Sequence, residues 1–477
     1  MSMALVSEAV RRLGRSPALG PWLVGAYRAA CRGGALYLIG LEPTRAIYVS
    51  GSMARDTNVV PGVSDIDLVS VAELATTEAE LAFREALAAR QRRLNAVVPA
   101  FHSLEYFDLA DVAYLRAFGN GWVELDTAWR RVAGTAPPGL TDYRRPGHEL
   151  RLARLVQALL TWRKSGCHLL DPRLGAADWV LTRAAERVLA VTLAMWLDHD
   201  RHEPLAHLLD AGARRGLAVP VPDRGPVRGR IRACLAASLT VLEHLADECT
   251  AGWSEAPSVA AAELHAPSPG AEARARSLVA AGFASAHLVP CETVERGHRL
   301  LALAAESDAP AAVVERAERA FLELPPATPA DRFPSRPLVL TPRLWRAALV
   351  IDPSPWLGAA LASGAARSFG AQAAPIVAPP PAELDTLLRL RSVELFYRAR
   401  GRRFRIGKPF APGRLAADLN LASLLARAMD TGEIALISRT VPRTEPAQIG
   451  ALRDFVASRR AALRDELERR VSARVAS

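Results

Sequence analysis

Residues 48–71, YVSGSMARDTNVVPGVSDIDLVSV, contain two apolar runs, and their pattern decides the fold. A Gly-Ser pair, Gly51 and Ser52, ends the first run, and an Asp-x-Asp pair, Asp65 and Asp67, begins the second. Short apolar runs bounded by turn residues predict two buried strands. Carboxylates two residues apart on a strand repel each other, so the placement of this pair requires a physical explanation, such as a bound partner that offsets the repulsion.

The segments around this stretch predict a small sheet with a crossover helix. Strands are expected over residues 45–52 and 64–73, and a third is expected over residues 98–109. Between them, TTEAELAFREALAARQRRL predicts a capped amphipathic helix that begins near Thr76 or Thr77. The fold class is therefore α+β, with a small mixed sheet at its centre.

The rest of the 477-residue chain is expected to be largely helical. Half of its residues are hydrophobic but only 6% are aromatic, and Ala and Leu abound, which favours helices. We predict a catalytic domain over residues 1–145, a helical domain over 146–250 and a mostly helical region over 271–477. A segment rich in Ala, Pro and Ser separates the last two.

Charge and cysteine usage limit the function classes. The formal net charge is +10, which raises the question of a polyanionic partner. However, the arginines alternate with acidic residues along helical segments, so a nucleic-acid surface is not favoured. Five scattered cysteines without a C-x-x-C pair predict reduced thiols in the cytoplasm, and no apolar stretch predicts membrane spanning or secretion.

The Asp-x-Asp pair has the chemistry of a metal site. Side chains alternate between the two faces of a strand, so Asp65 and Asp67 share one face while Ile66 and Leu68 point to the other. A cation between the carboxylates would offset their repulsion, and hard oxygen ligands of this kind suit Mg²⁺. At the preceding turn, backbone N–H groups at Gly51 and the Ser52 hydroxyl could meet phosphate oxygens.

These residues together resemble a known signature. The pattern G-S-x-x-R, followed after eight residues by S-D-I-D-L, resembles that of the nucleotidyltransferase superfamily, which includes DNA polymerase β, the aminoglycoside nucleotidyltransferases and minimal nucleotidyltransferases. The resemblance implies that Gly51, Ser52, Arg55 and Ser64 contact a nucleotide and that Asp65 and Asp67 hold the metal. Asp56 departs from the family, whose members usually carry glycine after the arginine.

The resemblance also implies a third carboxylate on the strand after the helix. Glu105 and Asp108 both lie in the segment HSLEYFDLADV, and their positions have opposite parity along the strand. Glu105 is favoured as the third catalytic and metal-binding residue because of its place early in the strand, but the sequence leaves Asp108 open.

The expected activity is transfer of a nucleoside monophosphate, AMP from ATP, to a hydroxyl of a small-molecule acceptor, with release of pyrophosphate. Two alternatives stay open: transfer to a macromolecule, either RNA or a partner protein, and nucleotide binding without turnover. The sequence leaves the acceptor, the nucleotide base and the oligomeric state unspecified.

Three weaker patterns are explained more simply by structure. His199, His202 and His207 lack the i, i+4 spacing of a helical zinc site. The segment GRRFRIGKPF, residues 401–410, is too irregular for a Walker loop and predicts an arginine-rich turn. Three tryptophans that recur 17 residues apart, from residue 162 to residue 196, are expected in a core.

Overall fold

The computed structural model divides the chain into two compact units. The first contains Met1–Arg145, Val393–Leu419 and Val441–Ser477, and the second contains Pro146–Ser392 and Asn420–Thr440. The structure describes residues 10, 13, 16, 18–54, 59, 66–98, 100–101, 103–109, 112, 129–135, 147–199, 203–221, 225–255, 267–290, 298–324, 336–347, 366–371, 377–378, 380, 383, 386–387 and 444–462. The three-domain division remains a prediction.

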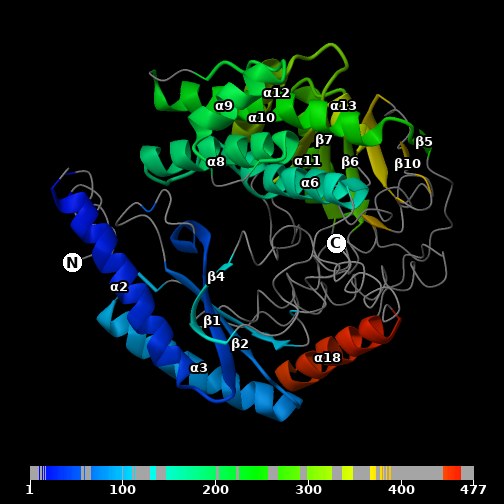
Figure 1. Cartoon of the computed structure of the whole chain (residues 1–477). Coiled ribbons are helices and arrows are strands. Elements are labelled where there is room, and N and C mark those ends of the chain that lie inside the picture. The colour runs from blue at the N-terminus through cyan, green and yellow to red at the C-terminus, as the bar shows by residue number, and fades with distance from the viewer. Residues whose placement is uncertain are drawn as a thin grey trace. The chain divides into compact units, whose positions relative to one another are not determined.

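A four-stranded mixed sheet forms the centre of the first unit (Figure 1). Its order is β3-β2-β1-β4; β2 and β3 are parallel, and β1 pairs antiparallel with β2 and β4. The strands are β1 (Thr44–Ser50), β2 (Asp67–Ala72), β3 (Ser103–Asp108) and β4 (Trp129–Gly134). Strands β1, β2 and β3 confirm the three strands predicted from the sequence. The sequence analysis did not predict β4.

The helix α3 (Thr77–Val97) connects the parallel strands β2 and β3, as a parallel pair requires. Its N-cap is Thr76, whose side chain accepts a hydrogen bond from the backbone N–H of Ala79 at 3.1 Å. Glu78 and Glu80 lie in its first turn, where negative charge is favourable. The predicted helix start is confirmed.

Helices α2 (Leu19–Ile39) and α3 cover one face of this sheet (Figure 1). Gly34 of α2 lies so close to Phe101 that an added Cβ would come within 2.6 Å of the ring, so glycine permits this packing. Tyr106 of β3 packs edge to face on Phe83 of α3, with ring centroids 5.8 Å apart. The even-numbered residues of β2 and β3 therefore point into the helix layer.

The C-terminal helix α18 (Glu445–Ala462) belongs to this first unit and contacts α3. Its Arg453 donates hydrogen bonds to the carbonyls of Leu74 and Ala75, at 2.7 and 2.8 Å. The same guanidinium lies 3.2 Å from the fully buried Glu80 carboxylate. A residue near the C-terminus thus neutralises a carboxylate in the N-terminal part of the chain.

The second unit combines helices with a second four-stranded sheet, whose order is β8-β7-β6-β9 (Figure 1). Within the region expected to be mostly helical, the sequence analysis did not predict these strands. Its helical elements are α6 (Gly147–Thr161), a π-helical turn (Trp162–Gly166), α7 (Cys167–Leu169), α8 (Asp178–Leu197), α9 (Leu205–Arg214), α10 (Val227–Thr250), α11 (Pro269–Ala280), α12 (Pro310–Glu323) and α13 (Pro342–Arg346). Its strands are β5 (Ser254–Glu255), β6 (Ser285–Pro290), β7 (His298–Leu303), β8 (Leu338–Leu340), β9 (Arg367–Gly370) and β10 (Val377–Ala378), with β5 pairing with β10.

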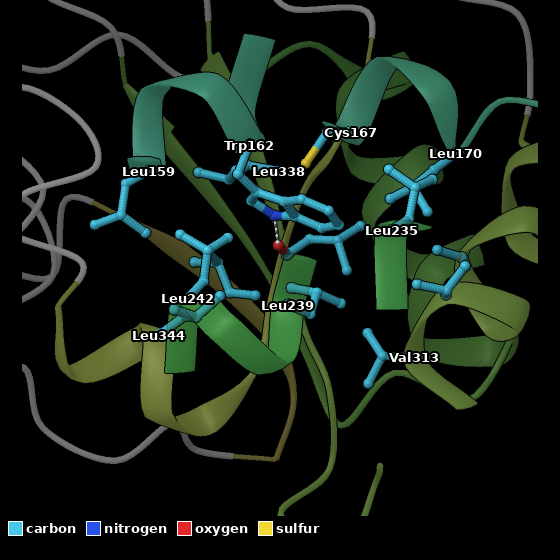
Figure 2. Close-up of a cluster of buried hydrophobic side chains, with 14 of the residues drawn as sticks. Leu159, Trp162, Cys167, Leu170, Leu235, Leu239, Leu242, Val313, Leu338 and Leu344 are labelled. Atoms are coloured by element: carbon cyan, nitrogen blue, oxygen red, sulfur yellow. Dashed lines mark hydrogen bonds between the residues drawn. The ribbon is translucent and has the colours of Figure 1, made fainter. Parts of the chain in front are cut away.

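One hydrophobic core joins the helices and the sheet of this unit. Trp162, which is fully buried, lies among leucines such as Leu235 and Leu239 of α10 (Figure 2). Its indole N–H donates to the carbonyl of Val339 on β8 at 2.9 Å, which satisfies the polar atom of a buried tryptophan. Trp162 and Trp196 are therefore core residues as expected, whereas Trp179 of α8 is only half-buried.

The described part of the chain is accordingly mixed α+β, which confirms the predicted class. None of the helices in the described ranges is both long enough and apolar enough to cross a membrane.

Candidate functional site

The candidate site begins where β1 ends and the short 3₁₀ helix η1 (Gly51–Ala54) starts. Gly51 has φ 69°, in the left-handed region that residues with a Cβ enter at an energetic cost. An atom at the Cβ position of Gly51 would lie 3.6 Å from Oδ2 of Asp67. Because Ser50 pairs with Asp67 across the sheet, the turn and the carboxylate lie side by side.

Strand register places Asp67 and Glu105 on one face of the sheet. In the parallel pair, Asp67 aligns with Ser103 and Val69 aligns with Glu105. Aligned residues point to the same face, and so do residues two apart on a strand. The two half-buried carboxyl groups are thus diagonal neighbours, on the face opposite the α2 and α3 layer.

Three aromatic residues lie on the same face as the two carboxylates: Tyr48, Phe107 and Trp129. The ring centroid of Trp129 lies 5.9 Å from that of Tyr48 and 5.3 Å from that of Phe107. All three side chains are buried, so they form a packed apolar layer beside the carboxylates. This layer joins β1, β3 and β4 and supports the face that carries Asp67 and Glu105.

An arginine of β4 fixes the turn. The Nη2 atom of Arg130 donates a hydrogen bond to the carbonyl of Met53 in η1, at 2.9 Å. Arg130 is half-buried and Met53 is fully buried, so the contact is partly shielded from water. The geometry of η1 therefore depends on β4, a strand that is distant in sequence.

Asp108 occupies a different environment from Glu105. Its odd offset from Glu105 directs it to the helix-covered face, where it is 9% exposed. Its Oδ1 accepts a hydrogen bond from the backbone N–H of Leu74 at 3.3 Å, and its Oδ2 lies 3.8 Å from Arg453. These contacts hold together the C-terminal end of β2 and helix α18. Of the two acidic candidates on β3, Glu105 is the one on the Asp67 face.

The remaining predicted residues lie partly outside the described ranges. Arg55, Ser64 and Asp65 are outside them, and Ser52 is described only as part of the backbone of η1. Within the described ranges, no group of three or more His, Cys, Asp or Glu residues is arranged to hold a metal ion. Asp67 and Glu105 supply hard oxygen atoms that suit Mg²⁺, and Asp65 precedes Asp67 by two residues.

The weaker patterns do not form a second site in the described residues. Nδ1 of His199 lies 3.1 Å from the carboxylate of Glu203, in an exposed pair, and His202 lies outside the described residues. The arginine-rich segment 401–410 also lies outside them.

Sequence reasoning missed Trp129 and Arg130, which lie beside the site, and Arg453, which pairs with acids on the helix-covered face. WRRVAG, the sequence of β4, has adjacent arginines that obscure its alternation, and nothing local marks Arg453 as a partner of residues near Leu74. Comparison of the chain with protein-family models, with curated proteins and with solved structures gives no significant match. Membership of the nucleotidyltransferase superfamily therefore remains a prediction that rests on the residues themselves.

Proposed function

We propose that the chain is an Mg²⁺-dependent nucleotidyltransferase that transfers AMP from ATP to a hydroxyl of a small-molecule acceptor and releases pyrophosphate. The observation that carries the proposal is the position of Asp67. Its carboxylate lies against the Gly51 turn and on the same face as Glu105. A phosphate contact and a metal contact would thus be adjacent.

In this proposal, the turn that begins at Gly51 binds the phosphates of the nucleotide. Gly51 and Ser52 begin η1 immediately after β1, where backbone N–H groups can donate to phosphate oxygens. Positive φ at Gly51 sets the direction of the chain there, and the hydrogen bond from Arg130 to Met53 holds the turn in place. Arg55 and Ser64 are assigned to nucleotide binding by the sequence signature alone.

Asp65, Asp67 and Glu105 would hold the metal. When bound, Mg²⁺ offsets negative charge on the phosphates and on the leaving pyrophosphate. Carboxylates gathered on one face of a sheet repel each other, and a divalent cation relieves that repulsion. Glu105 would also orient the acceptor hydroxyl or accept its proton, whereas Asp108 is engaged with Leu74 and Arg453.

The test compares variants at three acids, Asp67 of β2 and Glu105 and Asp108 of β3. Purified protein is incubated with α-labelled ATP, Mg²⁺ and cell metabolites, and label transfer is measured for Asp67→Asn, Glu105→Gln and Asp108→Asn. We expect the first two to lose at least about a hundredfold in rate, the order seen when a group that stabilises the transition state is removed. Asp108→Asn should mainly lower stability and retain most of the activity per folded molecule.

Mg²⁺-dependent binding of ATP is measured on the same variants. If the Asp67→Asn variant kept both Mg²⁺-dependent ATP binding and label transfer, the proposal would be contradicted. Retained binding by wild-type protein with no transfer to any acceptor would favour nucleotide binding without turnover.

The acceptor is tested separately, because the basic pI of about 9.9 is compatible with a macromolecular acceptor. Label from ATP is followed into three fractions: metabolites, total RNA and protein. Label confined to RNA or protein would replace the small-molecule acceptor while leaving nucleotidyl transfer intact.

A further inference from the structure

A cluster of arginines lies in the second unit, whereas the residues assigned to nucleotidyl transfer belong to the first. Its members come from the segment after α7, from the first two turns of α10 and from the start of the segment leading into β8. We call the four arginines and their two acidic partners the arginine cluster: Arg173, Arg228, Arg232, Arg336, Asp171 and Glu318.

Asp171 holds one side of the cluster. Nε of Arg173 lies 2.9 Å from its Oδ1, and Nε of Arg336 lies 3.6 Å from its Oδ2. Asp171 itself is nearly buried, whereas Arg173 is about half exposed, with 49% of its side-chain surface accessible. Arg336 also approaches Nε2 of His168 at 3.3 Å. One carboxylate is thus shared by two guanidinium groups.

Glu318 of α12 holds the other side. It is buried, with 3% of its side chain exposed, and it contacts both Arg228, at 2.5 Å, and Arg232. These two arginines are one turn apart on α10, so their charges are close and repel each other. Burial lowers the pKa of Arg228 against the opposing effect of Glu318, and the proximity of Arg232 lowers it further.

The two sides are connected. Nη2 of Arg228 also donates to the carbonyl of Leu170, the residue before Asp171, at 3.3 Å, and the Asp171 charge favours the protonated form of Arg228. Within the described residues, the cluster carries four positive charges against two negative ones, an excess of two. Guanidinium groups keep their charge at any physiological pH, so the excess is permanent.

Donor groups remain available in the cluster. Nε of Arg232 donates to Glu318, and within the described residues the buried Nε of Arg228 and the buried Oε1 of Glu318 have no hydrogen-bond partner. A network that served stability alone would be expected to match charges and donors, because unpaired donors and repelling arginines are unfavourable. The start of α10 adds to the positive potential, since its first turn has no acidic residue and no side-chain cap.

We propose that the arginine cluster binds a dianionic phosphate group, either free phosphate or the terminal phosphate of a small phosphorylated molecule. The charge of such a group equals the excess of two. Its tetrahedral oxygens accept the paired N–H groups of guanidinium, the geometry for which arginine is suited. The half-exposed side chains of Arg173 and Arg232 provide access from solvent.

The experiment measures binding of inorganic phosphate and of pyrophosphate to the full-length protein by titration calorimetry. EDTA is present to exclude Mg²⁺, and ionic strength is held constant. Arg173→Gln and Arg232→Gln test the two sides of the cluster; both side chains are about half exposed, so neither substitution empties a core. Arg183→Gln, at an exposed position of α8 in the same unit, is the matched control. Asp67→Asn separates this site from the proposed nucleotide site.

We expect saturable phosphate binding that both cluster variants weaken about tenfold or more, the loss typical when a charged hydrogen bond is removed. Arg183→Gln and Asp67→Asn should bind phosphate like wild type. Absence of saturable binding up to about 10 mM phosphate, a very weak affinity, would overturn the proposal. Equal weakening by Arg183→Gln and Arg232→Gln would also overturn it, because it would indicate general attraction to a basic protein.

Discussion

Loss of Arg453 should strongly destabilise the first unit. Its guanidinium joins α18 to the end of β2, the start of α3 and the end of β3, through the carbonyls of Leu74 and Ala75 and the carboxylates of Glu80 and Asp108. Glu80 is completely buried and also accepts a hydrogen bond from the Tyr106 hydroxyl at 3.1 Å. Removal of Arg453 would take one cationic partner from a buried carboxylate.

The substitution Arg453→Met keeps the aliphatic part of the side chain and removes the charge. Removing one partner of a buried ion pair costs about 3–5 kcal/mol. The side chain of Arg453 is 21% exposed, so water can replace part of the lost contact. We therefore expect a loss of about 3 kcal/mol in unfolding free energy, at the lower end of that range. Glu80→Gln combined with Arg453→Met should cost less than the sum of the single changes, by about 1–3 kcal/mol.

Urea unfolding, followed by near-ultraviolet circular dichroism, measures these free energies, and amide hydrogen exchange over α3 and β3 shows where protection is lost. Asp454→Asn, at an exposed position of the same helix, is the control and should change stability by less than about 0.5 kcal/mol. If Arg453→Met behaved like Asp454→Asn, or if the double variant were additive, the ion pair between Arg453 and Glu80 would not stabilise the fold.

Three further predictions concern the turn, a buried histidine and the thiols. Gly51→Ala should lower stability by about 1 kcal/mol, because φ of 69° is unfavourable with a Cβ, and it should also lower nucleotide affinity in the same titration; unchanged values for both would refute the role of the turn. Burial lowers the pKa of His287 from 6.5 to about 4, so the imidazole stays neutral in the folded protein while the unfolded chain takes up a proton. Stability should fall as the pH drops from 6.5 to 4, by up to about 3 kcal/mol, and His287→Gln should flatten this dependence in urea titrations. Burial raises the pKa of Cys167 and Cys249 to about 12, so peptide mapping after alkylation of native protein at pH 8 should find both unmodified, and rapid labelling would contradict their burial.

The central strands and the helix between them could be predicted because their signals are local. The apolar runs, the Thr76 cap and the Gly-Ser turn each involve residues within a few positions of one another. The third strand begins at Ser103, later than expected, because Val98 caps helix α3 and its carbonyl accepts a hydrogen bond from the N–H of Phe101. The sequence was sufficient to predict that this segment is a strand, but not to predict the residue at which the strand begins.

The second sheet could not be predicted from its sequence pattern. All six residues of β7, HRLLAL, are buried, so the strand lacks the alternation of a strand with one exposed face. A short, largely apolar run in a chain rich in Ala and Leu is equally compatible with a buried helix. Only the pairing of β7 with β6 and β8, which are separated from it by intervening segments, distinguishes the two.

For the candidate site, too, some features follow from the local sequence and others only from contacts between distant segments. Alternation along β3 already separates Glu105 from Asp108, since residues three apart on a strand face opposite ways. Alternation does not show which face of the sheet is covered by helices. The structure answers this through contacts that span large sequence separations, such as the ion pair between Arg453 and Glu80, 373 residues apart.

The different environments of Glu105 and Asp108 on β3 have one physical cause: each carboxylate needs a partner on the face to which it points. A carboxylate directed into the helix layer must be paired, and Asp108 has the Leu74 N–H and Arg453 within reach. Glu105 is directed to the face that carries Asp67 and the Gly51 turn, where the proposed partner is a metal ion bound together with a phosphate. Exchange of Glu105 for Gln and of Asp108 for Asn should therefore separate the two roles: the first should lower activity with little effect on stability, and the second should do the reverse.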